Sequence, residues 1–244
     1  MEVADEHPCE PRLSPVEPHP ARLRRRALVV VGAAGLVAAL LPLDRVLSDA
    51  LRAARPSGDL RRELELIQQF GSPTTILLAA VLVWRLDSPR LKQVLDWVVA
   101  AAVTAAAVWV VKVSCGRARP KLGDPLAFLG PFGEWPAQDD QPARAAARFW
   151  ERGASELWAM PSSHTAAAVV GAVALSRMYP RLTPVVWTLA GVVAFARVSL
   201  GAHWATDVVV GGAMAYLIAE GVIRREWGQR VVAALTRSPR SAPG

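Results

Sequence analysis

The chain has 244 residues, 52% of them hydrophobic, and its mean hydropathy of +0.26 is high for a water-soluble domain. Its formal net charge is +7. On a soluble protein this charge would suggest nucleic acid, but beside apolar segments it indicates Lys and Arg next to anionic lipid, so no nucleic-acid partner is expected. The two cysteines, Cys9 and Cys115, provide neither a disulfide framework nor a zinc-binding pattern.

The two ends of the chain differ in composition from its apolar body. Residues 1–21 are rich in Pro, Glu and His without an apolar period, and they predict a disordered tail. Residues 236–244 are rich in Ser, Pro and Arg and predict a second one. Residues 22–235 between them are interpreted as one integral membrane domain. The basic run 22–26 before Ala27 resembles a signal peptide, but no cleavage site follows, so a first membrane helix is expected.

Six apolar segments predict an all-α fold, a bundle of six transmembrane helices. They are Ala27 to Leu41, Pro73 to Leu86, Val94 to Val113, Ser162 to Met178, Pro184 to Leu200 and Trp204 to Ile223. The second and fourth are short against the ~20 residues that cross a bilayer. Two further helices are expected outside the bundle, an amphipathic one at Ala50 to Glu65 and one at Pro142 to Arg152.

The distribution of positive charge indicates an orientation. With six spans both termini lie on one side, and every connection on that side is basic, as the positive-inside rule requires of the cytoplasmic face. The segment from Ser114 to Ala159, placed outside, also holds six Lys and Arg residues. Either the topology is wrong there, or those cations bind something anionic. Arg117 and Lys121 among them are interpreted as interfacial cations, and Glu220 as a solvated acid.

Three polar clusters interrupt the apolar body at helix ends. The first runs from Lys112 to Pro120, the second from Pro161 to His164, and the third from Arg197 to Asp207. Because successive membrane helices alternate in direction, all three clusters are expected at the outer membrane face. Their convergence would form one site.

The residue types in these clusters are those of phosphoryl transfer. Lys112, Arg119 and Arg197 supply three cations for one anion. Ser162 can cap a helix whose first N–H groups, those of Ser163 and His164, favour phosphate. His203 and Asp207 lie four residues apart, so the carboxylate can orient the imidazole. One histidine can then attack phosphorus while His164 protonates the leaving oxygen. With no acidic cluster to hold a metal, metal-free and cofactor-free catalysis is expected.

These residues match a family signature. A Lys followed after six residues by Arg-Pro, then Pro-Ser-x-His, then Arg, five residues, His, three residues and Asp resembles the three-part signature of type 2 phosphatidic acid phosphatases (PAP2). The resemblance extends from about the second helix to the sixth. It implies a six-helix membrane bundle that hydrolyses a lipid phosphomonoester or diphosphate through a phosphohistidine intermediate. It also implies roles for individual residues: nucleophile for His203, its partner for Asp207, general acid for His164, and phosphate binding for Lys112, Arg119, Ser162, Ser163 and Arg197.

Two positions depart from the family pattern. Ser163 stands where Gly is usual, and Ala196 stands where Ser usually precedes the Arg. Gly permits a positive φ that Ser disfavours, so Ser163 is acceptable if it is already helical. Neither change removes a group that the reaction needs, although either can change rate or specificity.

Several alternatives remain open. A lipid-to-lipid phosphotransferase would use the same residues, and a catalytically silent binder of lipid phosphates would share the fold. A vanadate-dependent haloperoxidase would share the anion pocket, but those related enzymes are soluble. The expected location is the bacterial cytoplasmic membrane, with both termini inside and the site facing outward. The sequence does not identify the lipid or any protein partner.

Overall fold

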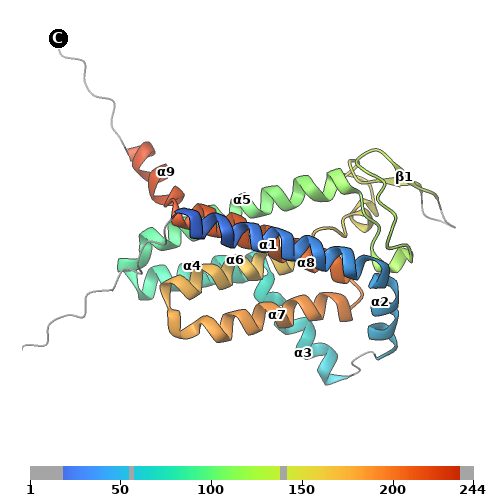
Figure 1. The fold of residues 1–244 in the computed structure, drawn as a ribbon, viewed down its shortest axis with the longest axis horizontal. Helices are drawn as coiled ribbons and strands as arrows, with labels where there is room; N and C mark the ends of the chain where they lie inside the picture. The colour runs from blue at the N-terminus through green and yellow to red at the C-terminus, as the bar shows by residue number, and fades with distance from the viewer. Residues whose placement is uncertain (1–18, 55–57, 138–141, 237–244) are drawn as a thin grey trace, which may run out of the picture.

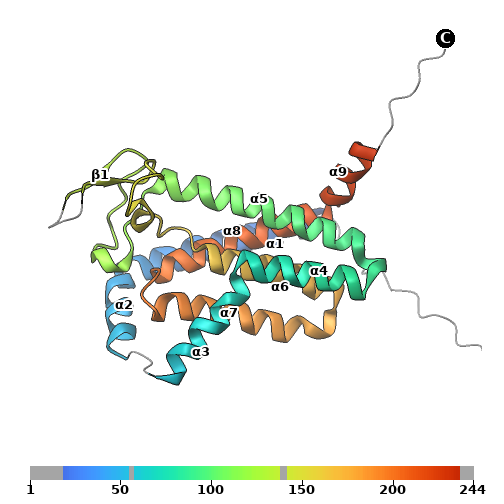
Figure 2. The same cartoon turned by 180° about the vertical axis from the view of Figure 1, so that it is seen from behind.

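The computed structural model describes residues 19–54, 58–137 and 142–236, which form a bundle of long helices (Figures 1 and 2). Six of its helices coincide with the six predicted apolar segments: α1 (His19–Leu40), α4 (Pro73–Leu86), α5 (Leu91–Cys115), α6 (Ser163–Met178), α7 (Thr183–Ser199) and α8 (Ala205–Arg224). Most of both predicted tails lies outside the described residues. However, residues 19–21 and 236, assigned to those tails, are helical.

Four helical stretches are long and apolar enough to cross a membrane: Pro20–Ala53, Ser88–Cys115, Pro180–Ser199 and Ala205–Arg224. A fifth is possible if Asp59–Gly71 and Pro73–Leu86, which are bent by 61° at their junction, form one broken span. Helix α6 has only 16 residues, about 24 Å against a hydrocarbon core of about 30 Å. The structure therefore describes a membrane protein with four or five candidate spans, and the six-span count stays a prediction.

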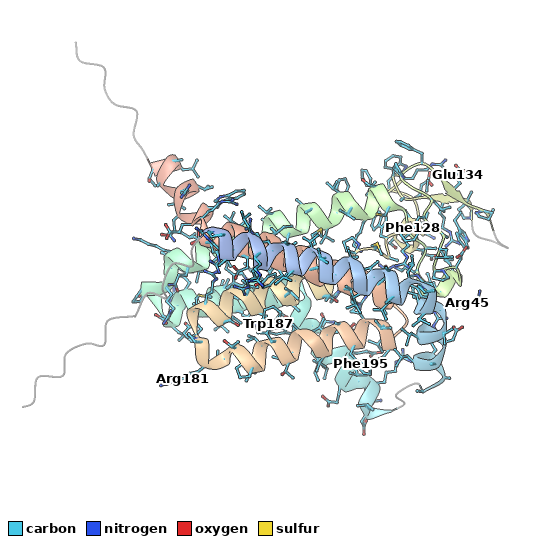
Figure 3. The ribbon with its side chains drawn as sticks, in the orientation of Figure 1. Arg45, Phe128, Glu134, Arg181, Trp187 and Phe195 are labelled. Atoms are coloured by element: carbon cyan, nitrogen blue, oxygen red, sulfur yellow. The ribbon has the colours of Figure 1, made fainter. Side chains whose placement is uncertain are left out.

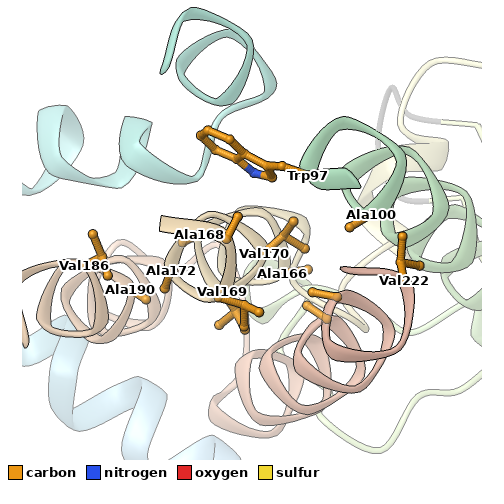
Figure 4. Close-up of a cluster of buried hydrophobic side chains, with 14 of the residues drawn as sticks. Trp97, Ala100, Ala166, Ala168, Val169, Val170, Ala172, Val186, Ala190 and Val222 are labelled. Carbon is orange, nitrogen blue, oxygen red and sulfur yellow. The ribbon is translucent and has the colours of Figure 1, made fainter. Parts of the chain in front are cut away.

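Helix α6 lies at the centre of the bundle and packs against α5, α7 and α8. Its inward positions are Ala, Gly and Val, whose small side chains let neighbouring helices approach closely. Figure 4 shows Trp97 of α5, Ala190 of α7 and Val222 of α8 around this helix. The centre of the fold is thus a short helix whose polar first turn is held within a ring of longer ones.

The segment between α1 and α4 differs from the prediction. In place of one amphipathic helix at Ala50 to Glu65, the chain forms α2 (Asp44–Ala53) and α3 (Asp59–Ile67). The 3₁₀ turn η1 (Leu41–Leu43) precedes α2, and another, η2 (Gln68–Gly71), follows α3. Ser72 then caps α4 by accepting a hydrogen bond from the N–H of Thr75, with Pro73 at the first helical position.

A further helix, α9 (Trp227–Thr236), was not predicted as a separate element. The buried carboxylate of Asp96 in α5 accepts hydrogen bonds from the backbone N–H groups of Gly228 (2.8 Å) and Gln229 (3.2 Å). These are unpaired donors at the start of α9, where a negative charge is favourable. Asp96 therefore fixes the position of α9 on the bundle.

The long connection between α5 and α6 is mostly irregular. Residues 142–152, predicted to be helical, instead include the strand β2 (Arg144–Ala145), which pairs antiparallel with β1 (Glu134–Trp135). Three of the six cations of this connection are paired with its acids: Lys121 and Arg144 with Glu156, and Arg148 with Glu134 and Glu151. These ion pairs neutralise part of the positive charge that the positive-inside rule disfavours on the proposed outer face.

Candidate functional site

The three polar clusters meet at one end of the bundle, where α5 and α7 end and α6 and α8 begin (Figure 1). Backbone hydrogen bonds tie the clusters together. The N–H of Ser162 donates to the carbonyl of Asp207 (3.0 Å), and the N–H of Ala159 donates to the carbonyl of Arg117 (3.1 Å). The convergence expected from alternating helix directions is therefore present in the structure.

His203 lies in the short connection between α7 and α8 and is 1% exposed. Its Nδ1 lies 2.6 Å from the carbonyl oxygen of Ala159 and 3.5 Å from Oδ2 of Asp207. Because a carbonyl only accepts hydrogen bonds, Nδ1 carries the hydrogen, and in the neutral ring the lone pair lies on Nε2. Burial lowers the pKa of His203 to about 4, against an opposing effect of Asp207 and with further lowering by Lys112 and Arg119. The ring is therefore neutral at physiological pH, with its lone pair on Nε2.

Asp207, in the first turn of α8, is completely buried and has three interactions. Oδ2 accepts a hydrogen bond from the N–H of Trp204 (2.8 Å) and faces His203. Oδ1 accepts a hydrogen bond from Nη1 of Arg117 (2.5 Å). Asp207 thus fixes the connection that carries His203 as well as facing the imidazole ring.

The prediction that Arg117 is an interfacial cation is wrong, because its side chain is completely buried beneath the site. Nη1 donates to Asp207 and to Oγ1 of Thr206 (2.6 Å), Nη2 donates to Asp44 (2.8 Å), and Nε donates to the carbonyl of Pro125 (3.1 Å). Every nitrogen of the guanidinium is occupied within the protein. Arg117 therefore has a positioning role and is not available to bind phosphate.

Asp44, at the start of α2, also belongs to this buried network and was not predicted from the sequence. It is also completely buried, and it accepts hydrogen bonds from Arg117 and from both the N–H (3.1 Å) and Oγ1 of Thr206. An acid 73 residues before Arg117 gives no sequence signal of this contact. Its carboxylate and that of Asp207 hold Arg117 between them, so a residue near the end of the α1 segment supports the first turn of α8.

Arg119 and Arg197 contrast with Arg117. The Nε of each is buried without a hydrogen-bond partner among the described residues. Arg197 also donates from Nη1 to Oε1 of Gln68 in η2 (2.5 Å), a contact that the sequence did not indicate. Burial lowers the pKa of Arg119, which nonetheless remains a cation. Unpaired guanidinium donors in a buried position suit an anionic ligand.

Lys112, in the last turn of α5, is buried and donates from Nζ to the carbonyl of Trp158 (2.6 Å). Arg119 and Arg197 are the neighbouring charges that interact with it most strongly among the cations. An ammonium group has three donors, so two remain after this hydrogen bond. All three predicted cations therefore belong to one electrostatically coupled group.

The start of α6 has the predicted cap. Ser162 Oγ accepts hydrogen bonds from the N–H (3.4 Å) and hydroxyl (3.0 Å) of Thr165, and its side chain is buried. Ser163 is the first residue of α6 and is exposed, while His164 is half-buried. Glu226 is the only non-glycine residue with positive φ in the described part of the chain. Ser163 is therefore already helical, and its replacement of Gly causes no backbone strain.

Two glycines let neighbouring elements approach this turn. A Cβ added to Gly71 in η2 would lie 2.1 Å from the carbonyl oxygen of His164, and one added to Gly211 in α8 would lie 2.6 Å from that of Ser162. Real Cβ atoms do not approach oxygen so closely, so any side chain here would displace the turn. Close backbone packing on both sides therefore sets the position of His164.

Among residues 19–54, 58–137 and 142–236, no three or more His, Cys, Asp and Glu side chains are grouped so as to hold a metal ion.

Comparison with known proteins agrees with the fold and the motifs. A model of the PAP2 superfamily matches residues 93–230, more than half of the chain, and the chain belongs to this superfamily. The crystal structure of the first transmembrane PAP2 type phosphatidylglycerolphosphate phosphatase from Bacillus subtilis has a similar fold, with a TM-score of 0.56 and 17% sequence identity. The match covers 88% of this chain and 98% of that one. No curated protein sequence gave a significant match.

Family, fold and apolar helices together define a PAP2-type membrane protein and support a phosphatase activity. Asp44 lies outside the matched residues 93–230, so one buried carboxylate of the site network comes from outside the region that defines the family.

Proposed function

We propose that the protein hydrolyses a lipid phosphomonoester or diphosphate without a metal ion or cofactor, through a phosphohistidine formed on His203. The observation that carries this proposal is the hydrogen bond from His203 Nδ1 to the carbonyl of Ala159, which leaves Nε2 as the nucleophilic nitrogen. Phosphatidic acid, phosphatidylglycerol phosphate and polyprenyl diphosphates are all candidate substrates. The phosphatase activity of the Bacillus subtilis protein of similar fold supports this class of substrates.

The reaction proceeds in two steps. Nε2 of His203 attacks phosphorus, and the bond from phosphorus to the lipid oxygen breaks as His164 donates a proton to that oxygen. His164 then removes a proton from water, which attacks phosphorus and breaks the P–N bond. This step releases inorganic phosphate and restores both histidines.

The transferring phosphoryl group is held by charge and by helix-end donors. Lys112, Arg119 and Arg197 supply three cations, and the first turn of α6, with Ser162 and Ser163, supplies N–H groups and a favourable dipole. In a buried site these fixed charges stabilise the developing negative charge more strongly than water does. Asp207 stabilises the positive charge that His203 gains when the P–N bond forms.

The proposed orientation places both termini in the cytoplasm and the site at the outer leaflet of the bacterial cytoplasmic membrane. The basic inner connections support it, as does the local pairing of Lys121, Arg144 and Arg148 on the outer side. In a Cys9→Ser/Cys115→Ser background, Phe132→Cys should react with an impermeant maleimide from outside, and Arg181→Cys only after the membrane is opened. The reverse pattern would overturn the orientation.

The nucleophile is tested by phosphate release from purified protein. With EDTA present, the parent should release phosphate from at least one of phosphatidic acid, phosphatidylglycerol phosphate and undecaprenyl diphosphate. His203→Ala should reduce this release by at least about 10³-fold, because the covalent route is lost. Ser163→Gly, which restores the common family residue, is the control and should stay active. Activity retained in His203→Ala would remove the proposed nucleophile, and loss with EDTA would overturn the metal-free route.

A further inference from the structure

The start of α1 and the end of α8 lie side by side at the end of the bundle opposite the candidate site (Figure 1). A cationic pocket lies between them. Its main polar lining is five arginines and one acid: Arg22, Arg25, Arg26, Arg224, Arg225 and Glu220. The cavity volume is about 120 Å³. A single water needs about 10–15 Å³ on this measure, so a hydrated phosphate group fits.

The single acid in this lining is already paired with two arginines. Glu220, predicted to be solvated, is instead mostly buried and paired with Arg224 (Nε–Oε2, 2.6 Å) and with Arg177 (Nη2–Oε1, 3.1 Å). Arg177 comes from α6 and adds another positive charge beside the pocket. The negative charge of Glu220 is thus shared by Arg224 and Arg177, and among the described side chains Glu220 forms no ion pair with Arg22, Arg26 or Arg225.

The arginines come from two helices that face each other. Arg25 and Arg26 lie three and four residues after Arg22, so the three side chains share one side of α1. A Cβ added to Gly221 in α8 would lie 3.2 Å from Nη2 of Arg26 and 3.7 Å from Nη1 of Arg225. Arg25 stacks on the ring of Tyr216, 5.4 Å from its centroid. Packing of α1 on α8 therefore brings the guanidinium groups of Arg26 and Arg225 together over Gly221. This approach of like charges is unfavourable unless an anion lies among them.

The position of the pocket indicates the source of that anion. Leu23 and Leu28, which flank the arginines on α1, are 56% and 64% exposed, and α1 begins a candidate membrane span. The arginines thus lie at the boundary between apolar and polar surface, where lipid headgroups lie. Guanidinium groups bind phosphate in a planar, bidentate manner, and basic pockets between membrane helices bind anionic headgroups.

We propose that this pocket binds the phosphate of an anionic membrane lipid, which fastens the start of α1 to the end of α8. The ligand is a phosphodiester headgroup such as that of phosphatidylglycerol, which carries a negative charge and has no phosphomonoester to hydrolyse. The site is distinct from the candidate catalytic site at the other end of α8. The inference depends on the membrane character of the protein and not on the proposed reaction.

The test compares lipid binding by the full chain and two matched variants, by thermal unfolding and native mass spectrometry in a neutral detergent. Phosphatidylglycerol should raise the Tm of the parent and bind more tightly than phosphatidylcholine. Arg22→Gln/Arg225→Gln should weaken phosphatidylglycerol binding on the order of tenfold, because two cations near the headgroup are lost. Arg181→Gln should bind like the parent, because Arg181 lies at the same end of the bundle but does not line the pocket (Figure 3).

Three results would overturn the proposal. They are equal binding of phosphatidylcholine, unchanged phosphatidylglycerol binding in the double variant, and equal stabilisation by inorganic phosphate or glycerol 3-phosphate, which would indicate a free phosphate as the ligand. If the double variant does not purify, Arg225→Gln at an exposed position replaces it. His203→Ala should keep the lipid response, so failure of the proposed reaction and failure of this inference give different results.

Discussion

The distances from His203 Nδ1 to its two acceptors indicate the separate roles of Ala159 and Asp207. The carbonyl of Ala159 is closer to His203 Nδ1 (2.6 Å) than Asp207 is (3.5 Å), so a backbone group, and not the carboxylate alone, sets the tautomer. The shortest side-chain contact of Asp207 is instead with Nη1 of Arg117 (2.5 Å). We infer that Asp207 acts mainly by its charge when His203 becomes positive, and by holding the connection that carries it.

The lowered pKa of His203 predicts a pH dependence. The pKa is about 4 in the folded protein and about 6.5 in the unfolded chain, so the unfolded chain binds more protons between these values. The contribution of His203 to stability is therefore complete above pH 6.5 and decreases as pH falls towards 4. The acidic limb of the pH profile of kcat/KM, which reports protonation of Nε2, should likewise lie below pH 6.5 and near pH 4.

The measurement is a pH profile of kcat/KM, with the titration of the substrate phosphate determined separately. Arg119→Gln should move the acidic limb to higher pH, because removal of a nearby cation favours the protonated ring. An acidic limb at pH 6.5 or above in the parent, with no substrate titration to account for it, would contradict the prediction.

Asp44 provides a test of the buried network. Asp44→Asn leaves Arg117 paired with Asp207 alone, and loss of one partner of a buried ion pair costs about 3 kcal/mol of stability. We expect a lower melting temperature and a lower kcat, with KM little changed because Asp44 contacts Arg117 and Thr206 and none of the proposed phosphate-binding cations. Asp49→Asn is the matched control, since Asp49 lies on the same helix with its side chain 64% exposed. Asp44→Glu should restore kcat in part; equal effects at both positions would mean that Asp44 has no special role.

At the scale of the elements, the structure depends on how closely η2, α6 and α8 approach one another. Helix α6 begins among polar residues, and the N–H of Ser162 just before it donates to the carbonyl of Asp207 in the first turn of α8 (3.0 Å), which places His164 beside the start of α8. The close approach of Gly71 and Gly211 fixes its first turn from two sides. A short central helix thus keeps the proposed site within the bundle, where charge interactions are strong.

Gly71→Ala tests this packing. Its Cβ would lie 2.1 Å from the carbonyl oxygen of His164, so η2 or the start of α6 must move, and His164 moves with it. We expect a fall in kcat and a lower melting temperature. Gly191→Ala in α7 is the control, because a Cβ there meets no atom within 4 Å and Ala favours the helix by up to about 1 kcal/mol. Full activity of Gly71→Ala would show that close packing at this point is not needed for catalysis.

At the scale of the whole molecule, α1 connects the two ends of the bundle along α8. It begins at the cationic pocket and leads through η1 to Asp44, which lies beneath the proposed catalytic residues. The pocket and the site therefore lie at opposite ends of the same pair of helices (Figures 1 and 2). Asp44, in α2, contributes a buried carboxylate to the candidate site from outside the residues matched by the family model.

The sequence alone determined the positions of the six long helices and the convergence of the three motifs at one end. Both follow from local physical chemistry, because apolar segments form helices in a membrane and their alternating direction fixes which ends meet. It also predicted the Ser162 cap, whose partner is three residues away. It did not predict the strand at Arg144–Ala145 in place of a helix at residues 142–152, because the pairing with residues 134–135 overrides local preference.

Only the tertiary structure decided the roles of Arg117, Asp44 and Gln68, and the partner of His203 Nδ1. These depend on contacts between residues far apart in the chain, up to 162 positions for Asp44 and Thr206, which no local pattern records. Arg117 and Arg119 are two residues apart and chemically identical, yet one is fully paired and the other keeps an unpaired Nε. Their difference arises from which buried carboxylates lie opposite each side chain, and that is fixed when α2 and α8 pack together.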